Sequence, residues 1–390
     1  MDLELSCIYC SNESFEQGRG SEEHAILSSL GGRKTSKNVC CVGCNNRLGK
    51  EIDEDMSESL SFFSTMLDIT TGRRKRAPTQ KLFGEHEGKK FDILAGGKIK
   101  FSKSNVDINE QDEGAEISIS ANSEEEALKI LSEVLKKYGK SIDDFKDLEA
   151  KSVRSYIPRV SGCIQIGGEK QFRSVAKMAL TYLATFVSPD RLRLPEFQSI
   201  IGYINKEGVE NSFVSFTTEE PPSEVEPISE INHRLIVSSC DSSKRVVAIL
   251  EIYGNIRFFI TLTEDWSGPS TSKAYTIDPV TQESREIEVS DAENILCLSH
   301  ENGADQEALR TAVGNIIESF QQRQMSEEIS KLVNKAVANH ISGKYESITN
   351  KMISSLASEV ALEFIRMIHR IDTEEVIDLK KLNKPNQSDK

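Results

Sequence analysis

The stretches "CIYC", residues 7–10, and "CCVGCNNRLG", residues 40–49, decide how the N-terminal part of the chain folds. Two cysteines in each are separated by two residues, Cys7 from Cys10 and Cys41 from Cys44, and such a tight turn directs two thiolates at one ion. Two turns of this kind form a tetrahedral site, so we expect these four cysteines to bind a structural Zn²⁺. Cys40 is an alternative ligand in place of Cys41, but the spacing of two residues before Cys44 favours Cys41.

Composition limits the classes of protein to which the chain can belong. The 390 residues suffice for two or three domains, and a net charge of -14 argues against a general nucleic-acid coat. The sequence lacks a membrane-spanning apolar run and a signal peptide, so we expect no membrane association and a cytoplasmic location. In that compartment closely spaced cysteines are metal ligands more often than disulfides. The isolated Cys163, Cys240 and Cys297 are predicted to be small buried core residues.

Polar residues between and after the two cysteine pairs narrow the prediction further. Glu23 and His24 are followed by a glycine pair, then by Asn38, and Asn45 comes directly after Cys44. This layout resembles the HNH endonucleases, which are built on a hairpin, a helix and one catalytic metal ion. Leu27 departs from the family pattern, which commonly has proline at that position, and the interval from Asn38 to Asn45 is shorter than in many members. The resemblance covers residues 7 to about 53.

The resemblance implies a role for each of these polar residues. His24 would be the general base that activates water, because its unperturbed pKa is about 6.5. Asn38 would orient His24. Glu23 and Asn45 would bind a catalytic Mg²⁺ or Mn²⁺, since hard divalent ions prefer oxygen ligands, and Asn46 competes with Asn45 for this position. Glu23 and His24 would point to opposite faces of a strand, so the hairpin has to twist to bring both to one phosphate.

Basic residues supply candidates for phosphate contacts. The run "GRRKRAPTQK" follows the cysteine-rich segment, and an equally good interpretation of this run is a solvated linker. The predicted nucleic-acid-binding residues are Arg33, Arg47, Arg73, Arg74, Lys75 and Arg76.

The rest of the chain has an α+β pattern. Short alternating segments after residue 88 predict strands, residues 124–138 predict a helix capped by Ser123, and residues 172–187 predict a buried helix. Strands with short turns between residues 233 and 289 predict an antiparallel sheet. The predicted fold is a zinc-stapled ββα-metal HNH module, a mixed α/β region with an antiparallel sheet, and a helical C-terminus. The predicted divisions are 1–72, 73–302, 303–372 and a flexible tail at 373–390.

The C-terminal helices have a long apolar stripe. Apolar residues recur at intervals of three or four from Met325 to Ile371, and Gly343 is a candidate break between two helices. Such a stripe can pack against the chain's own sheet. Its near-heptad spacing also suits a homodimer through residues 305–371, which would bring two nuclease modules to one duplex.

Two functions are consistent with these patterns. The first is a metal-dependent HNH endonuclease that acts on nucleic acid, with DNA favoured over RNA, restrained until a partner or ligand activates it. The resemblance also implies a place in bacterial defence or in a mobile element. The second is a non-catalytic zinc module that binds nucleic acid or protein, and such a module does not need Glu23 and His24.

Overall fold

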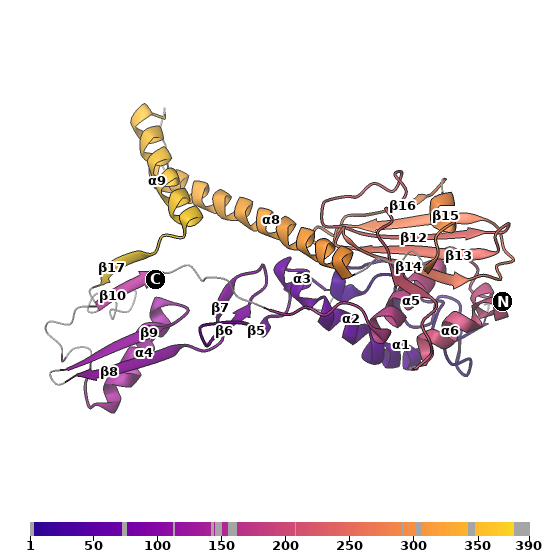
Figure 1. Ribbon diagram of the computed structural model, residues 1–390, viewed down its shortest axis with the longest axis horizontal. Coiled ribbons are helices and arrows are strands. Elements are labelled where there is room, and N and C mark those ends of the chain that lie inside the picture. The colour runs from indigo at the N-terminus through magenta and orange to yellow at the C-terminus, as the bar shows by residue number, and fades with distance from the viewer. Residues whose placement is uncertain are drawn as a thin grey trace. The chain divides into compact units, whose positions relative to one another are not determined.

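The computed structural model describes residues 4–71, 76–111, 114–141, 144, 150–154, 162–206, 208–290, 292–300, 306–341 and 348–377. The chain forms two compact units. Unit 1 contains residues 1–80, 94–98 and 163–321, and unit 2 contains residues 81–93, 99–162 and 322–390. Both units are therefore discontinuous in sequence and cut across the predicted divisions at residues 72 and 302. The mixture of helices and antiparallel sheets confirms the predicted fold class (Figure 1).

Unit 1 begins with small antiparallel hairpins and a run of helical turns. β1 (Glu4–Ser6) pairs with β2 (Ser14–Glu16), and β3 (Glu23–His24) pairs with β4 (Thr35–Ser36). A 3-10 turn at Ser28–Leu30 lies between β3 and β4. The helical turns that follow are α1 (Val42–Leu48), a π-helical turn at Gly49–Asp53, α2 (Glu54–Ser59) and α3 (Ser61–Met66). This N-terminal module has the hairpin-and-helix order that the sequence predicts.

The large sheet of unit 1 has six antiparallel strands in the order β11-β14-β13-β12-β15-β16. Their bounds are β11 Val214–Phe216, β12 His233–Cys240, β13 Arg245–Ile252, β14 Ile256–Thr263, β15 Thr271–Ile277 and β16 Ser284–Glu288. Alternate residues of β12 face different clusters: Leu235 and Val237 join the main core, whereas Ile236 packs on the other face with α7 (Glu293–Leu296). Because both faces of the central strands are buried, those strands are apolar along most of their length.

Helix α5 (Glu169–Leu183) connects the N-terminal module to the sheet. Twelve of its residues are buried, because it packs against β3, β4 and the π-helical turn on one side and against β11 to β14 on the other (Figure 1). The short helix α6 (Gln198–Asn205) packs beside it. The main core therefore joins residues of the N-terminal module, α5 and the sheet in a single cluster.

Apart from α8, the other strands and α-helices of the described residues belong largely to unit 2. They are β5 (Gln80–His86), β6 (Lys89–Ile93), β7 (Ile99–Phe101), β8 (Asn105–Gln111), β9 (Gly114–Ser120), α4 (Glu124–Lys137), β10 (Ala150–Arg154), α9 (Asn350–His369) and β17 (Thr373–Ile377). Ser123 caps α4 as predicted, by accepting a hydrogen bond from the backbone N–H of Glu126. The predicted flexible tail begins too early, because residues 373–377 form β17 and pair with β10.

Helix α8 (Gln306–Ile341) includes residues of both units. Ile316 and Phe320 are buried in the main core of unit 1, whereas α9 has no buried residue. Two C-terminal helices are present as predicted, although Gly343 itself lies outside the described residues. Within the described part of the chain, no helix is long and apolar enough to cross a membrane.

Candidate active site and metal centre

The four predicted zinc ligands converge in the structure. The sulfur atoms of Cys7, Cys10, Cys41 and Cys44 all lie within 4.8 Å of one another, and among the described residues this is the one such group of His, Cys, Asp or Glu. Cys41 caps α1, and its Sγ accepts a hydrogen bond from the backbone N–H of Cys44 at 3.3 Å. Zn²⁺ prefers four thiolates in a tetrahedral arrangement, so this donor set fits the ion.

Cys40 is not part of this cluster. Its thiol points instead toward Glu23, with 3.7 Å between Sγ and Oε2, and burial raises the pKa of the thiol. The structure therefore selects Cys41 over Cys40. The three isolated cysteines are not core residues, contrary to the prediction: Cys163 and Cys297 are exposed and Cys240 is half-buried. They lie in the loop before α5, at the end of α7 and at the end of β12, where the chain leaves the core.

The glycine pair of the motif brings the hairpin close to the large sheet. Gly31 has a φ of +97°, and a Cβ on this residue would lie 2.7 Å from Pro279, in the turn after β15. At Gly32 a Cβ would lie 1.9 Å from the carbonyl oxygen of Ile26. Neither position accepts a larger side chain without movement of the backbone. The turn consequently fixes the strand that contains His24 against the body of unit 1.

His24 lies half-buried on the hairpin, on the face opposite to that of Glu23. Burial lowers its pKa, Glu22 raises it, and the charges of Lys177 and Arg33 lower it, with a net pKa below the usual 6.5. The imidazole is therefore neutral near pH 7, the form that accepts a proton. Exposed Glu22 directly precedes β3, and its Oε1 accepts a hydrogen bond from the hydroxyl of Thr35, the residue that pairs with His24 in the hairpin.

Glu23 is buried, in contrast to Glu22. Only 3% of its surface is exposed, and its Oε1 accepts hydrogen bonds from Lys177 Nζ and from the backbone N–H of His24. Lys177, on α5, is fully buried and also pairs with Asp53 Oδ2 at 2.7 Å. Burial lowers the pKa of Lys177, but the charges of Asp53 and Glu23 raise it by more, so the ammonium stays charged.

The asparagines make local contacts. The side-chain nitrogen of Asn45 donates to Ser21 Oγ at 2.8 Å and to the carbonyl of Glu22 at 3.0 Å, so both bonds use the nitrogen and not the oxygen of the amide. Asn46 is exposed. Asn38 Oδ1 accepts from the backbone N–H of Gly18 at 2.8 Å, so its amide holds the turn after β2. A role for Asn38 in orienting His24 therefore stays a prediction, with no support from these contacts.

The predicted phosphate-binding arginines are engaged within the chain. Arg33 donates to Gln282, Gly32 and Thr70. Arg47 contacts Glu51 and Asn205. Arg76 pairs with Asp68 at 3.0 Å. Arg73, Arg74 and Lys75 lie outside the described residues, so their assignment stays a prediction.

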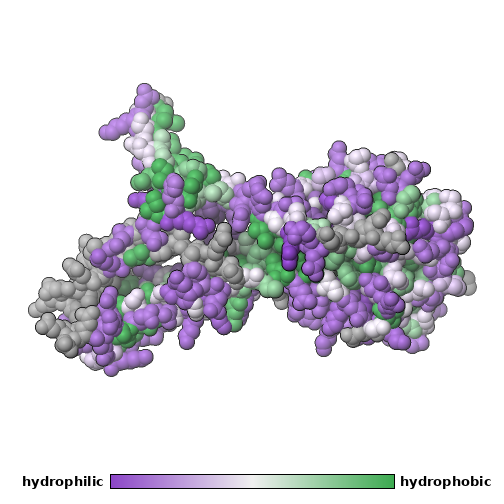
Figure 2. Space-filling model, viewed as in Figure 1, coloured by the Kyte–Doolittle hydropathy of each residue, from purple (hydrophilic) through white to green (hydrophobic). Residues whose placement is uncertain are grey.

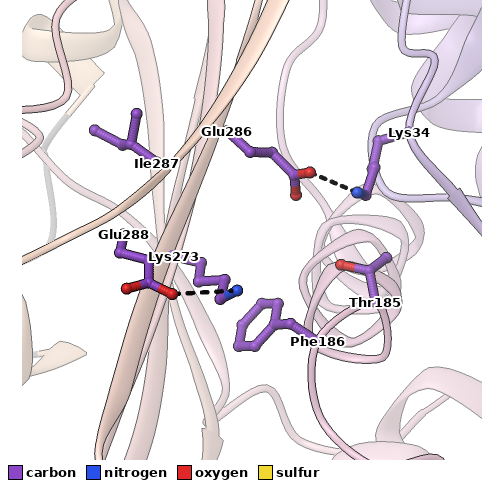
Figure 3. A pocket seen from close by; sticks show the side chains of 7 residues that line it. All are labelled: Lys34, Thr185, Phe186, Lys273, Glu286, Ile287 and Glu288. Atoms are coloured by element: carbon purple, nitrogen blue, oxygen red, sulfur yellow. Dashed lines mark hydrogen bonds and ion pairs between the residues drawn. The ribbon is translucent and has the colours of Figure 1, made fainter.

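A shallow pocket lies where the hairpin meets the sheet, but its charges are paired. Lys34 contacts Glu286 at 2.6 Å, and Lys273 lies 3.6 Å from Glu288, beside Phe186 (Figure 3). Because Lys34 and Lys273 are each paired with a glutamate, neither positive charge of this pocket is free to bind an anionic ligand.

Comparison with known families agrees with the geometry of the N-terminal module. Residues 7–61 match the HNH endonuclease family. We refer to this segment as the HNH module. No curated protein and no solved structure matched the chain.

The HNH match covers the zinc cluster, the hairpin and the helical turns, so the predicted resemblance is confirmed for these elements. The structure adds two residues that the sequence analysis did not identify as part of the site. Asp53 lies in the π-helical turn at the end of the motif, and "EID" after α1 was its only sequence signal. Lys177 lies 154 positions after Glu23, in a helix whose sequence pattern otherwise indicates a buried core helix. No local spacing could have connected it with Glu23.

Proposed function

We propose that the HNH module hydrolyses phosphodiester bonds in nucleic acid, with His24 as the general base. The observation that carries this proposal is the position of His24, half-buried and uncharged near neutral pH, on an accessible face of a hairpin that matches a nuclease family. A base must be deprotonated at the working pH and within reach of water, and this environment favours both conditions.

The proposed reaction is a simple hydrolysis. His24 takes a proton from water as the oxygen of that water attacks phosphorus. The bond from phosphorus to the 3′ oxygen breaks, and the departing oxygen takes up a proton from solvent. Glu22 stabilises the imidazolium that forms, since its negative charge raises the pKa of His24. Three hydrogen bonds hold Arg33 near His24, where its positive charge lowers the pKa of the histidine. A positive charge fixed in this position is suited to contact a phosphate.

The family implies a divalent ion, and Mg²⁺ or Mn²⁺ bound by Glu23 and Asn45 is the predicted form. Such an ion would neutralise charge on the phosphate. Glu23 does not fit this role in the structure, because Lys177, the His24 N–H and the Cys40 thiol surround its carboxylate. The amide oxygen of Asn45 remains suitable. Structural Zn²⁺ on the four cysteines fits without conflict.

The test uses the full-length protein with plasmid, single-stranded DNA and RNA, in Mg²⁺, in Mn²⁺ and in EDTA. We propose DNA as the substrate, so plasmid should be cut faster than RNA. Since the acidic body suggests restraint by a partner or ligand, each assay is repeated with a cell extract. A His24→Ala variant controls for contaminating nucleases. Absence of cleavage of every substrate, with and without extract, would overturn the proposal.

One observation favours a second candidate function. The carboxylate of Glu23, directly before His24, forms an ion pair with Lys177. This pairing is compatible with a non-catalytic zinc module that binds nucleic acid or protein. Under this alternative the protein would bind nucleic acid or a protein partner without cutting, and His24→Ala would leave that binding unchanged.

We also propose a homodimer through the C-terminal helices, a role in bacterial defence or in a mobile element, and a cytoplasmic location. Ile316 and Phe320 in the first half of α8 are buried in the core of unit 1, so the support for self-association comes from α9 and the end of α8. Figure 2 shows hydrophobic residues gathered there. Exposed apolar residues of these helices include Val337, Ile353, Leu362, Phe364, Ile365 and Ile368.

Light scattering of the full-length protein tests the dimer. We expect a dimer at micromolar concentration. A monomer, or a dimer that survives deletion of everything after Gly303, would contradict it.

A further inference from the structure

A buried charge cluster joins three distant parts of unit 1. Glu23 comes from β3, Asp53 from the π-helical turn and Lys177 from the middle of α5. The exposed fractions of the three side chains are 3%, 14% and 0%. Both carboxylates contact the same ammonium nitrogen. The cluster is therefore a cation surrounded by carboxylates, shielded from water.

The arrangement of oxygens is that of a cation site. Two carboxylates converge on one point, and the hydroxyl of Ser174 donates to Asp53 Oδ1 at 2.7 Å, which orients that group. Buried carboxylates are costly unless a positive charge balances them. In an HNH nuclease the acidic residue before the histidine is expected to meet a divalent ion, whereas here it meets a side chain of the protein itself.

We propose that the ammonium of Lys177 is the resident cation of the Glu23 and Asp53 carboxylates and excludes a divalent metal ion from them. This inference deepens the proposed function, on which it rests for the expected role of Glu23. Any metal ion used in catalysis is then held without Glu23, near Glu22 and His24 and beside Asn45, which donates to the Glu22 carbonyl.

The packing of α5 makes this cation permanent. The neighbours of Lys177 along the helix, Ala176 and Met178, are fully buried, as are Ala179 and Leu180 in the next turn. Because the lysine is fully buried, withdrawal of the ammonium would leave two carboxylates without a cation and would require the side chains around Lys177 to repack. A metal ion that displaced the lysine would have to compete with two direct contacts and with the packing around a fully buried side chain, so we expect the lysine to stay in place during each turnover.

The test measures Mn²⁺ binding rather than cleavage. The full-length zinc-loaded protein is titrated with Mn²⁺, and bound ion is counted by electron paramagnetic resonance. Wild type and Glu23→Gln should bind Mn²⁺ equally, because Glu23 is not available to the ion. Lys177→Met should gain one Mn²⁺ per chain, since two carboxylates lose their cation. The gain should be absent in Lys177→Arg and in the double variant Lys177→Met with Glu23→Gln.

Two results would overturn the proposal. One is Mn²⁺ binding by the wild type that is lost in Glu23→Gln, and this comparison holds even where Lys177→Met fails to fold. The other is a folded Lys177→Met that gains no Mn²⁺. Neither result depends on nuclease activity, so a failure of this inference is distinguishable from a failure of the proposed hydrolysis.

Discussion

The N-terminal module contains two charged centres that are balanced in opposite ways. The four sulfur atoms of the cysteine cluster lie within 4.8 Å of one another, and as thiolates they carry a negative charge that a bound metal ion would balance. The carboxylates of Glu23 and Asp53 face a protein cation, Lys177. We therefore expect folding of the module to depend on a metal ion at the first centre and, at the second, on a helix that is distant in sequence.

The two centres also stabilise different parts of unit 1. The cysteine cluster connects two segments within the first 44 residues, so it acts inside the HNH module. The carboxylate cluster connects that module to α5 and through α5 to the large sheet. We infer that loss of zinc disrupts the module locally, while loss of Lys177 weakens the attachment of the module to α5 without removing the apolar core that they share.

The largest expected effect is that of removing a zinc ligand. Cys7→Ser should abolish stoichiometric zinc and unfold the HNH module, because structural zinc sites contribute about 10–16 kcal/mol of binding energy that is also folding energy. Zinc analysis and limited proteolysis measure the two effects. Cys163→Ser is the matched control, since Cys163 is exposed and outside the cluster. Wild-type protein purified without zinc, yet resistant to protease, would contradict the first half of the comparison.

The next effect is the loss of the internal cation. Lys177→Met should lower the free energy of unfolding by about 3–5 kcal/mol, as expected when one partner of a buried ion pair is removed. Urea unfolding followed by the fluorescence of buried Trp266, the single tryptophan, measures it. Lys170→Met changes an exposed lysine of the same helix and should have little effect. If both variants have the same stability, the buried cluster is not a structural connection.

A smaller effect concerns His233, which connects the hairpin to the sheet. Its Nδ1 accepts from the Tyr253 N–H at 3.0 Å and its Nε2–H donates to the Leu30 carbonyl at 2.8 Å, and burial lowers its pKa to about 4. The folded state disfavours the protonated ring. Stability should therefore fall as pH decreases from 6.5 through 4, by at most about 3 kcal/mol.

Urea unfolding at pH 7 and at pH 4.5 measures this loss by Trp266 fluorescence. The pH-dependent loss should be smaller in His233→Asn, which cannot take up the proton. His369→Gln, a change of an exposed histidine, should behave as wild type. The same pH dependence in all three proteins would show that other groups cause it.

The smallest expected effect is a shift in the pH dependence of cleavage when the charges around His24 are changed. His24 must be unprotonated to act as a base, so cleavage should decline as pH falls through its lowered pKa, with a midpoint below 6.5. Glu22→Gln should move this midpoint lower, because Glu22 raises the pKa of His24. Arg33→Met should move it higher. A rate profile with a midpoint above 6.5 in wild type would contradict this environment for His24.

The local features of this fold were accessible from sequence. Two-residue cysteine spacing predicted which four cysteines come together, because the geometry of a knuckle is set by adjacent residues. Apolar alternation located β12 to β16, and Ser123 marked the start of α4. The order of HNH residues predicted the hairpin and helix. Each of these predictions relied on residues close together in the chain.

The roles of Glu23 and Lys177 were not accessible in this way. Strand alternation implied that Glu23 and His24 face opposite sides, but only the packing of α5 decides which of those sides is covered. Lys177 lies in an apolar helix, where the usual prediction for a single lysine is a buried stem with its ammonium group in solvent. Similarly, apolar neighbours in the sequence predicted that the isolated cysteines are buried. In the structure they lie in a loop or at the end of a strand or helix, where the side chain is exposed or half-buried.

Cleavage of plasmid DNA by His24→Ala, compared with wild type, tests the central claim most directly. We predict that the variant retains one zinc per chain and its stability, while its rate falls by about 10²–10⁴, the usual contribution of a general base. Equal rates in the two proteins, with zinc content unchanged, would contradict the assignment of His24 as the base of an HNH nuclease.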